Sequence, residues 1–263
     1  AGAIAGIFKA PIAGLLFVVE VLMFDFTKTS AIPLLLSALS SATVAYFLMG
    51  TDVQFAFHVT SSFELSQIPF FILGIFCAAT SIYFLRMTDA VERIFKRITN
   101  VWFKVLAGAI ALGLIIYFFP PLFGEGYGSL MRLMEGHGSM IVQNSPFAGT
   151  EESAWAGLAM LLALILLKAI ATATTIGSGG VGGTFGPSLV VGGLSGYFIA
   201  LLCNQLGLSP QSTANFALVG MAAVMTGVMH APLMATFLIA EITGGYELMI
   251  PLLITSAVTY LVT

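Results

Sequence analysis

The most informative stretch of this sequence is GSGGVGGTFGP (residues 177–187), which opens a long apolar run, 188–205. Glycine lets a backbone turn sharply and approach a ligand closely. A helix that starts after such a turn offers unpaired N–H groups and the positive end of its dipole. The pattern therefore predicts a site for a small anion that needs no charged side chain. A tight helix-packing turn is the competing interpretation, because glycine is also common in membrane helices.

The composition indicates what surrounds the chain. Of its 263 residues, 59% are apolar and 8% are charged, and the mean hydropathy is +1.04. A soluble domain carries about a quarter charged residues, so this chain could not cover a surface that faces water. The net charge of −3 lacks the basic footprint of a nucleic-acid-binding protein. We expect an all-α membrane protein with the lipid bilayer around it and no nucleic-acid partner.

The lengths of the apolar runs indicate two kinds of helix. About twenty apolar residues are needed to cross the hydrocarbon layer, and the runs 67–87, 101–123 and 153–173 satisfy this. The runs 11–24, 215–229 and 231–243 are too short. Helices that stop part-way are tolerated only where protein or a water-filled path covers their ends. The short runs therefore suggest a transport pathway.

The basic residues indicate an orientation in the membrane. Five of the nine, Arg86, Arg93, Lys96, Arg97 and Lys104, fall between two long spans. Basic loops stay on the cytoplasmic side of a membrane, so we expect the loop 88–100 to be cytoplasmic and the loop 50–66 to face the other side. The expected location is a bacterial inner (cytoplasmic) membrane.

Two parts of the chain resemble each other. GIFKAP (6–11) matches GVMHAP (227–232), and a glutamate, Glu20 or Glu241, stands nine residues after each proline. Further on, IPLLLS (32–37) matches IPLLIT (250–255). A residue before proline avoids the helical conformation, whereas proline suits the first helical position. Each Ala-Pro is thus predicted to end one short helix and start another, as in transporters built from repeats.

GGTFGP (182–187) resembles the G-x-F-x-P signature of the CLC family of chloride channels and chloride/proton exchangers. The Ala-Pro units are similar to the family's paired short helices, and GEGY (124–127) to its G-x-G-Y turn before a short helix. The resemblance covers the whole chain and implies a CLC-like inverted-repeat bundle of tilted, partly re-entrant helices. Within one transmembrane domain (1–263), it places the end of the first inverted half at 1–50, a loop at 51–66 and the second half at 67–263.

The resemblance also implies a function and a site. It implies a homodimer that transports chloride or a similar small anion, with one pathway in each subunit. The anion would be held by the backbone N–H groups of Thr184 and Phe185. The remaining residues of that turn, which shape it, are Gly182, Gly183, Gly186 and Pro187.

Other family features lie outside this sequence. The turn with the anion-binding serine, the turn with the gating glutamate and the inner tyrosine do not occur in it, so we expect the chain to be the C-terminal two-thirds of the membrane domain. Val21 stands where well-known exchangers carry a second glutamate and channels do not. Channel or exchanger activity, anion preference and gating therefore stay open.

Glu20 and Glu241 are the remaining candidates for function. An ionisable group in an apolar helix is costly and suggests a functional site, but backbone hydrogen bonding at a helix end is an equally physical explanation. One alternative is an intramembrane enzyme with the two carboxylates as a pair, and another is a cation-coupled transporter of a small solute. No nucleophile supports an enzyme, and His58, His137 and His230 lack metal-ligand spacing. We expect no enzyme, cofactor or metal site.

Overall fold

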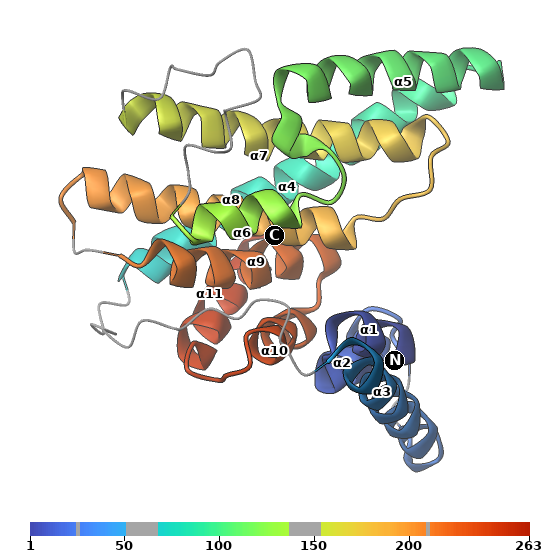
Figure 1. The fold of residues 1–263 in the computed structure, drawn as a ribbon, viewed down its shortest axis with the longest axis vertical. Coiled ribbons are helices and arrows are strands. Elements are labelled where there is room, and N and C mark those ends of the chain that lie inside the picture. The colour runs from blue at the N-terminus through green and yellow to red at the C-terminus, as the bar shows by residue number, and fades with distance from the viewer. Residues whose placement is uncertain (25–26, 51–67, 137–153, 209–210) are drawn as a thin grey trace.

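The computed structural model in Figure 1 is a bundle of helices. It describes residues 1–24, 27–50, 68–136, 154–208 and 211–263. All regular elements within these ranges are helical. In chain order they are α1 (Gly2–Phe8), α2 (Pro11–Glu20), α3 (Lys28–Met49), α4 (Ile68–Lys96), α5 (Val101–Phe118), the 3₁₀ turn η1 (Pro120–Leu122), α6 (Tyr127–Met134), α7 (Ala154–Gly177), α8 (Phe185–Gln205), α9 (Thr213–Met229), α10 (Pro232–Ile242) and α11 (Met249–Val262).

The helices have the two lengths that the sequence predicts. Among the described residues, five helices are long and apolar enough to cross a membrane, and they lie in α3, α4, α5, α7 and α8. The three long runs of the sequence analysis correspond to α4, α5 and α7. The helices α2, α9, α10 and α11 are apolar but have only 10 to 17 residues. The expected mixture of long and short apolar helices is therefore confirmed.

The segment 88–100, expected to be a loop, is mostly helical. Helix α4 continues to Lys96, so that only residues 97–100 connect it to α5. The extension is stable because Val91 and Phe95 are buried against Ala173 of α7. On the exposed side, Lys96 and Glu92 form an i,i+4 ion pair of 3.1 Å. The abundance of charged residues indicated a loop, but it reflects an amphipathic helix end.

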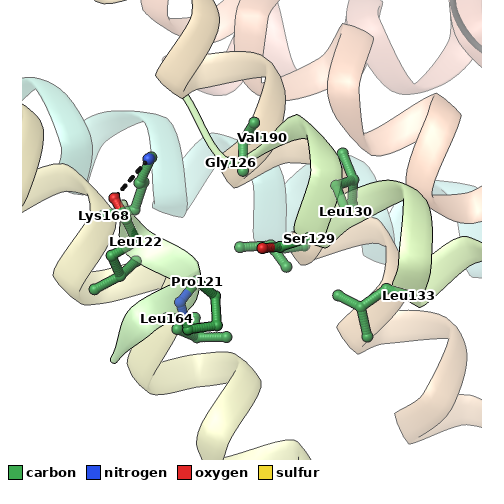
Figure 2. A pocket seen from close by; sticks show the side chains of 10 residues that line it. Pro121, Leu122, Gly126, Ser129, Leu130, Leu133, Leu164, Lys168 and Val190 are labelled. Carbon is green, nitrogen blue, oxygen red and sulfur yellow. Dashed lines mark hydrogen bonds between the residues drawn. The ribbon is translucent and has the colours of Figure 1, made fainter. Parts of the chain in front are cut away.

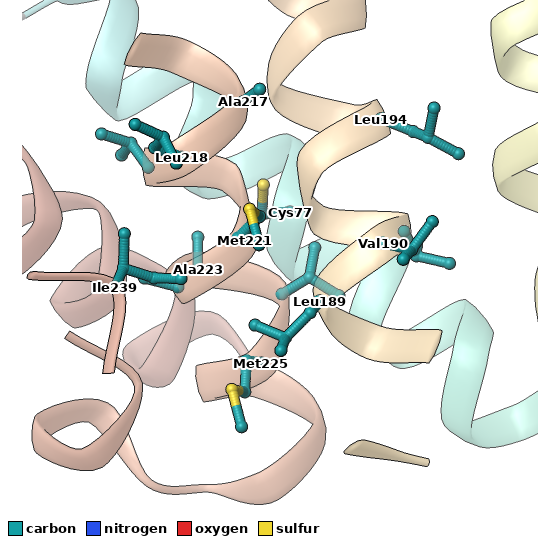
Figure 3. Close-up of a cluster of buried hydrophobic side chains, with 14 of the residues drawn as sticks. Cys77, Leu189, Val190, Leu194, Ala217, Leu218, Met221, Ala223, Met225 and Ile239 are labelled. Carbon is teal, nitrogen blue, oxygen red and sulfur yellow. The ribbon is translucent and has the colours of Figure 1, made fainter. Parts of the chain in front are cut away.

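Helices α8 and α9 form the centre of the bundle. Gly192 and Gly196, one turn apart on α8, face the backbone of α9 at Gly220 and Phe216. A side chain at any of these glycines would meet main-chain atoms of the partner helix, so the close approach depends on small residues. Buried side chains of α4, α8 and α9 close the core around this contact, among them Cys77, Leu189, Met221 and Met225 (Figure 3).

The first three helices form a smaller unit at the side of the bundle (Figure 1). Helices α1 and α3 pack through small residues, because Gly2 faces Ser37 and Gly6 faces Ser41. Helix α2 joins this unit to the rest of the molecule through its contact with α10. The unit therefore meets the larger bundle at the two helices that the sequence repeat identifies as equivalent.

The repeat is also present in the backbone conformation. Lys9 ends α1 in the left-handed region (φ 53°, ψ 34°), and His230 ends α9 in the same region (φ 55°, ψ 35°). The next residues, Ala10 (φ −122°, ψ 82°) and Ala231 (φ −129°, ψ 77°), are extended and precede a helix that begins with proline. Both copies thus break and restart the helix in the same way, as proline requires.

Candidate anion site

The glycine-rich turn links α7 to α8. Helix α7 ends at Gly177, and the N–H of Gly180 then donates to the carbonyl of Thr175 (2.9 Å), which bends the chain back. Residues 181–183 have no regular structure. Helix α8 begins at Phe185 with Thr184 as its N-cap. The helix start therefore falls within the stretch where the sequence predicts it.

The first N–H groups of α8 have no carbonyl partner. The first bond of the helix runs from the N–H of Ser188 to the carbonyl of Thr184 (3.0 Å), and no side chain caps this end. Within the described part of the chain, the N–H groups of Thr184 and Phe185 donate to no backbone carbonyl. These donors, with the positive end of a 21-residue helix, can stabilise a small anion.

Side chains from four other helices surround the turn. The ring of Phe185 lies 5.3 Å from that of Phe8 at the end of α1 and 6.2 Å from that of Phe17 in α2, centroid to centroid. The hydroxyl of Thr184 contacts the sulfur of Met229 in α9 at 3.9 Å. A Cβ at Gly186 would lie 3.4 Å from the hydroxyl of Tyr127, the first residue of α6. The turn thus lies where both repeat units meet.

The remaining residues of the predicted site differ in how much space surrounds them. A Cβ at Gly182 would lie 3.4 Å from the side chain of Ile176, whereas one at Gly183 would meet nothing within 4 Å. Pro187 follows within the first turn of α8 and is partly exposed. Gly182 and Gly186 therefore both face a neighbouring side chain at contact distance, whereas Gly183 faces open space.

Glu20 and Glu241 bind each other's helices. The two carboxylate oxygens of Glu20, at the end of α2, accept from the N–H groups of Leu233 (3.2 Å) and Met234 (2.7 Å) at the start of α10. The carboxylate of Glu241, at the end of α10, accepts from the N–H groups at the start of α2. These donors are Ile12 (3.0 Å) and Ala13 (2.9 Å).

This reciprocal capping has two consequences. Helices α2 and α10 must run antiparallel, as an inverted repeat requires, since the end of each meets the start of the other. The two carboxylates also lie at opposite ends of the pair, about 15 Å apart for a 10-residue helix. They do not form the close carboxylate pair that an intramembrane enzyme would need.

The sequence reasoning missed one buried cation, Lys168 in α7. It is 2% exposed, and its ammonium group donates to the carbonyls of Gly124 (2.6 Å) and Leu122 (3.2 Å). Figure 2 shows Lys168 beside the segment that leads into α6, at a small cavity between α6, α7 and α8. A lysine inside the apolar run 153–173 was the available signal, because ionisable residues within membrane spans are usually functional.

The histidines and cysteines are the residues that bear on a metal site. His58 and His137 lie outside the described residues, and His230 is the C-cap of α9. Within the described ranges no three His, Cys, Asp or Glu side chains are grouped so as to hold a metal ion. The two cysteines, Cys77 and Cys203, are free and buried.

Comparison with known proteins identifies the family of the chain. The family model described as voltage gated chloride channel matches residues 1–263. The H(+)/Cl(-) exchange transporter ClcA of Vibrio cholerae serotype O1 is 28% identical over 97% of this chain and 53% of its own length. The chloride channel protein CLC-e of Arabidopsis thaliana is 31% identical over 96% of this chain and 38% of its own length. The chain thus spans about half or less of these relatives.

Solved structures agree on the fold. A CLC-type fluoride/proton antiporter superposes with a TM-score of 0.75 at 23% identity, over 98% of this chain and 59% of that one. A slow cyanobacterial Cl−/H+ antiporter superposes with a TM-score of 0.72 at 24% identity, over 100% of this chain and 59% of that one.

Proposed function

The chain belongs to the voltage-gated chloride channel family, and from this premise we propose that it moves chloride or a similar small anion across a membrane. The activity would be that of a channel or of a proton-coupled exchanger, since relatives of both names are similar to it. The chain itself would supply part of the pathway, in which the N–H groups of Thr184 and Phe185 replace water around the anion.

The start of α8 is the observation that carries this proposal. The N–H groups of Thr184 and Phe185 have no carbonyl partner in the described chain, and no side chain caps this helix start. Backbone donors hold an anion by their dipoles, which favours binding weak enough to permit release.

A homodimer in a bacterial inner membrane completes the proposal. Helices α2, α3, α10 and α11 each leave large apolar side chains exposed, for example Ile12, Leu36, Leu233 and Leu253. We place these helices at the contact between two subunits and the other exposed apolar helices, such as α5, against lipid. The basic end of α4 and the connection 97–100 would face the cytoplasm.

Anion flux from liposomes that contain the full-length protein tests the function. We expect chloride release that depends on the protein and does not require a sodium gradient. Release that drives proton movement in the opposite direction would identify an exchanger, and release without proton movement would identify a channel. The absence of chloride, bromide and fluoride flux from liposomes with folded protein would contradict the proposal.

A further inference from the structure

The segment between α5 and α6 is an irregular part of the backbone packed against helices. After α5 the chain forms η1 (Pro120–Leu122), then passes through Gly124 (φ 64°) and Gly126 (φ 95°) into α6. Leu122 of this segment is buried, whereas residues 123–125 are exposed. Backbone groups that pack against the helices need hydrogen-bond partners, and these partners decide how firmly the segment is held.

Lys168 supplies these partners. Its ammonium group lies 2.6 Å from the carbonyl oxygen of Gly124 and 3.2 Å from that of Leu122. A Cβ at Gly126 would lie 3.5 Å from the same nitrogen and 3.2 Å from a methyl group of Val190. One buried lysine thus fixes the segment from α7, and α8 closes it from the other side.

The end of the same segment lies beside the glycine-rich turn, residues 177–187, referred to below as the anion turn. The side chains of Tyr127 and Glu125 approach Gly186, where a Cβ would lie 3.4 Å from the hydroxyl of Tyr127 and 3.8 Å from the carboxyl carbon of Glu125. Gly186 directly follows Phe185. A shift of the segment would therefore change the position of the N–H groups at the start of α8.

Packing between α6 and α8 makes this coupling rigid. Leu130, one turn into α6, is fully buried, and its side chain occupies the space that a side chain at Gly193 of α8 would need. Close-packed interiors transmit displacements of this kind rather than absorbing them. The 122–126 segment and Tyr127 thus link α7 to the start of α8, although Lys168 itself does not bond to the anion turn.

We propose that Lys168 is a positioning residue of the anion site, which acts by fixing the 122–126 backbone segment and through it Tyr127 and Glu125 against Gly186. This inference rests on the proposed function. A lysine with a purely structural role would affect folding and the amount of active protein. A positioning lysine would also change how tightly the site holds its anion.

The experiment measures chloride flux from liposomes against chloride concentration for Lys168→Met and Lys168→Arg in the full-length protein. We expect Lys168→Met to raise the half-saturating chloride concentration about tenfold, by comparison with residues that orient the ligands of other ion sites. Lys168→Arg should stay within about threefold of the wild type, because it keeps a charged donor beside the two carbonyls.

A glycine pair provides a test that does not depend on the stability of the lysine variants. Gly124→Ala strains a left-handed residue and adds a methyl group that meets nothing within 4 Å, so it disturbs only the segment. It should raise the half-saturating concentration roughly threefold or more. Gly128→Ala, in α6 and equally open, is the matched control and should leave this concentration unchanged.

The outcomes separate the two proposals. A wild-type protein without anion flux or chloride binding would overturn the proposed function, and the inference with it. A wild type with normal flux would overturn the inference alone if Gly124→Ala matched Gly128→Ala in half-saturating concentration. The inference alone would also be overturned if folded Lys168→Met had a lower maximal flux and thermal stability but an unchanged half-saturating chloride concentration.

Discussion

At the residue scale, Gly186 in the glycine-rich turn faces α6 without a side chain of its own. Gly186 faces the hydroxyl of Tyr127 from a distance at which a Cβ already makes van der Waals contact. A side chain that branches beyond Cβ, such as valine, would crowd the side chains of Tyr127 and Glu125. Gly183, three residues earlier, has open space instead, so the two glycines should differ in their tolerance.

We predict that Gly186→Val lowers chloride flux about tenfold or more, since it moves the turn that holds the N–H donors. Phe185→Leu should have a smaller effect, because it keeps the backbone N–H and loses ring contacts. Chloride flux from liposomes that contain equal amounts of folded protein measures the effects of both substitutions. Gly113→Val, in the open on α5, serves as the control, and equal flux in Gly186→Val and Gly113→Val would contradict the anion-turn proposal.

At the scale of elements, two contacts hold the repeat-built core together. The pairing of α2 with α10 depends on two carboxylates that each satisfy two N–H groups at a helix start. Such groups lack partners within their own helix and are costly to leave unpaired in an apolar environment. The pairing of α8 with α9 depends instead on glycines that let two backbones touch.

Neutral substitutions test the carboxylate contacts. Glu20→Gln and Glu241→Gln should each lower the free energy of unfolding by about 1–2 kcal/mol, because an amide can accept only one of the two N–H bonds. Their effects should add in the double variant, since the two sites lie at opposite ends of the helix pair. Thermal unfolding in detergent measures this. Glu92→Gln, which removes only the exposed ion pair with Lys96, should change stability by less than about 0.5 kcal/mol.

The α8–α9 contact should be less tolerant. Gly196→Leu would place a side chain against the backbone of α9 at Phe216 and Ala217, and we expect a loss of stability of several kcal/mol. The measurement is the yield of monodisperse protein and its unfolding temperature. Gly157→Leu, on α7 with nothing within 4 Å, should be tolerated. Equal yields of both variants would show that the close contact is not required.

At the scale of the whole molecule, the exposed apolar helices must meet either lipid or a second subunit. Helix α3 is an apolar span of which little is buried within one chain, and α11 leaves Ile250 and Leu253 exposed. We predict that Leu36→Cys on α3 or Leu253→Cys on α11 forms a cross-linked dimer in bilayers. Val105→Cys on α5, which is equally exposed, should not. Protein that stays monomeric with all three variants would count against the dimer.

Sequence patterns predicted the features that depend on neighbours in the chain. The lengths of apolar runs, the prolines after Ala10 and Ala231 and the glycines before Phe185 act through local conformation and solvation, so the helix breaks and the start of α8 could be predicted. Charge alone misled at 88–100, because burial of Val91 and Phe95 on the opposite face keeps that segment helical.

Tertiary structure decided which distant groups meet. Nothing local indicates that Glu20 binds N–H groups 213 and 214 residues away, or that Lys168 reaches carbonyls 44 and 46 residues away. The antiparallel arrangement of α2 and α10 follows from the Glu20 contact together with the reciprocal contact of Glu241, and the second contact holds the segment that leads into α6. Hydrogen bonds between groups remote in sequence depend on how the helices pack, and packing is a property of the whole chain.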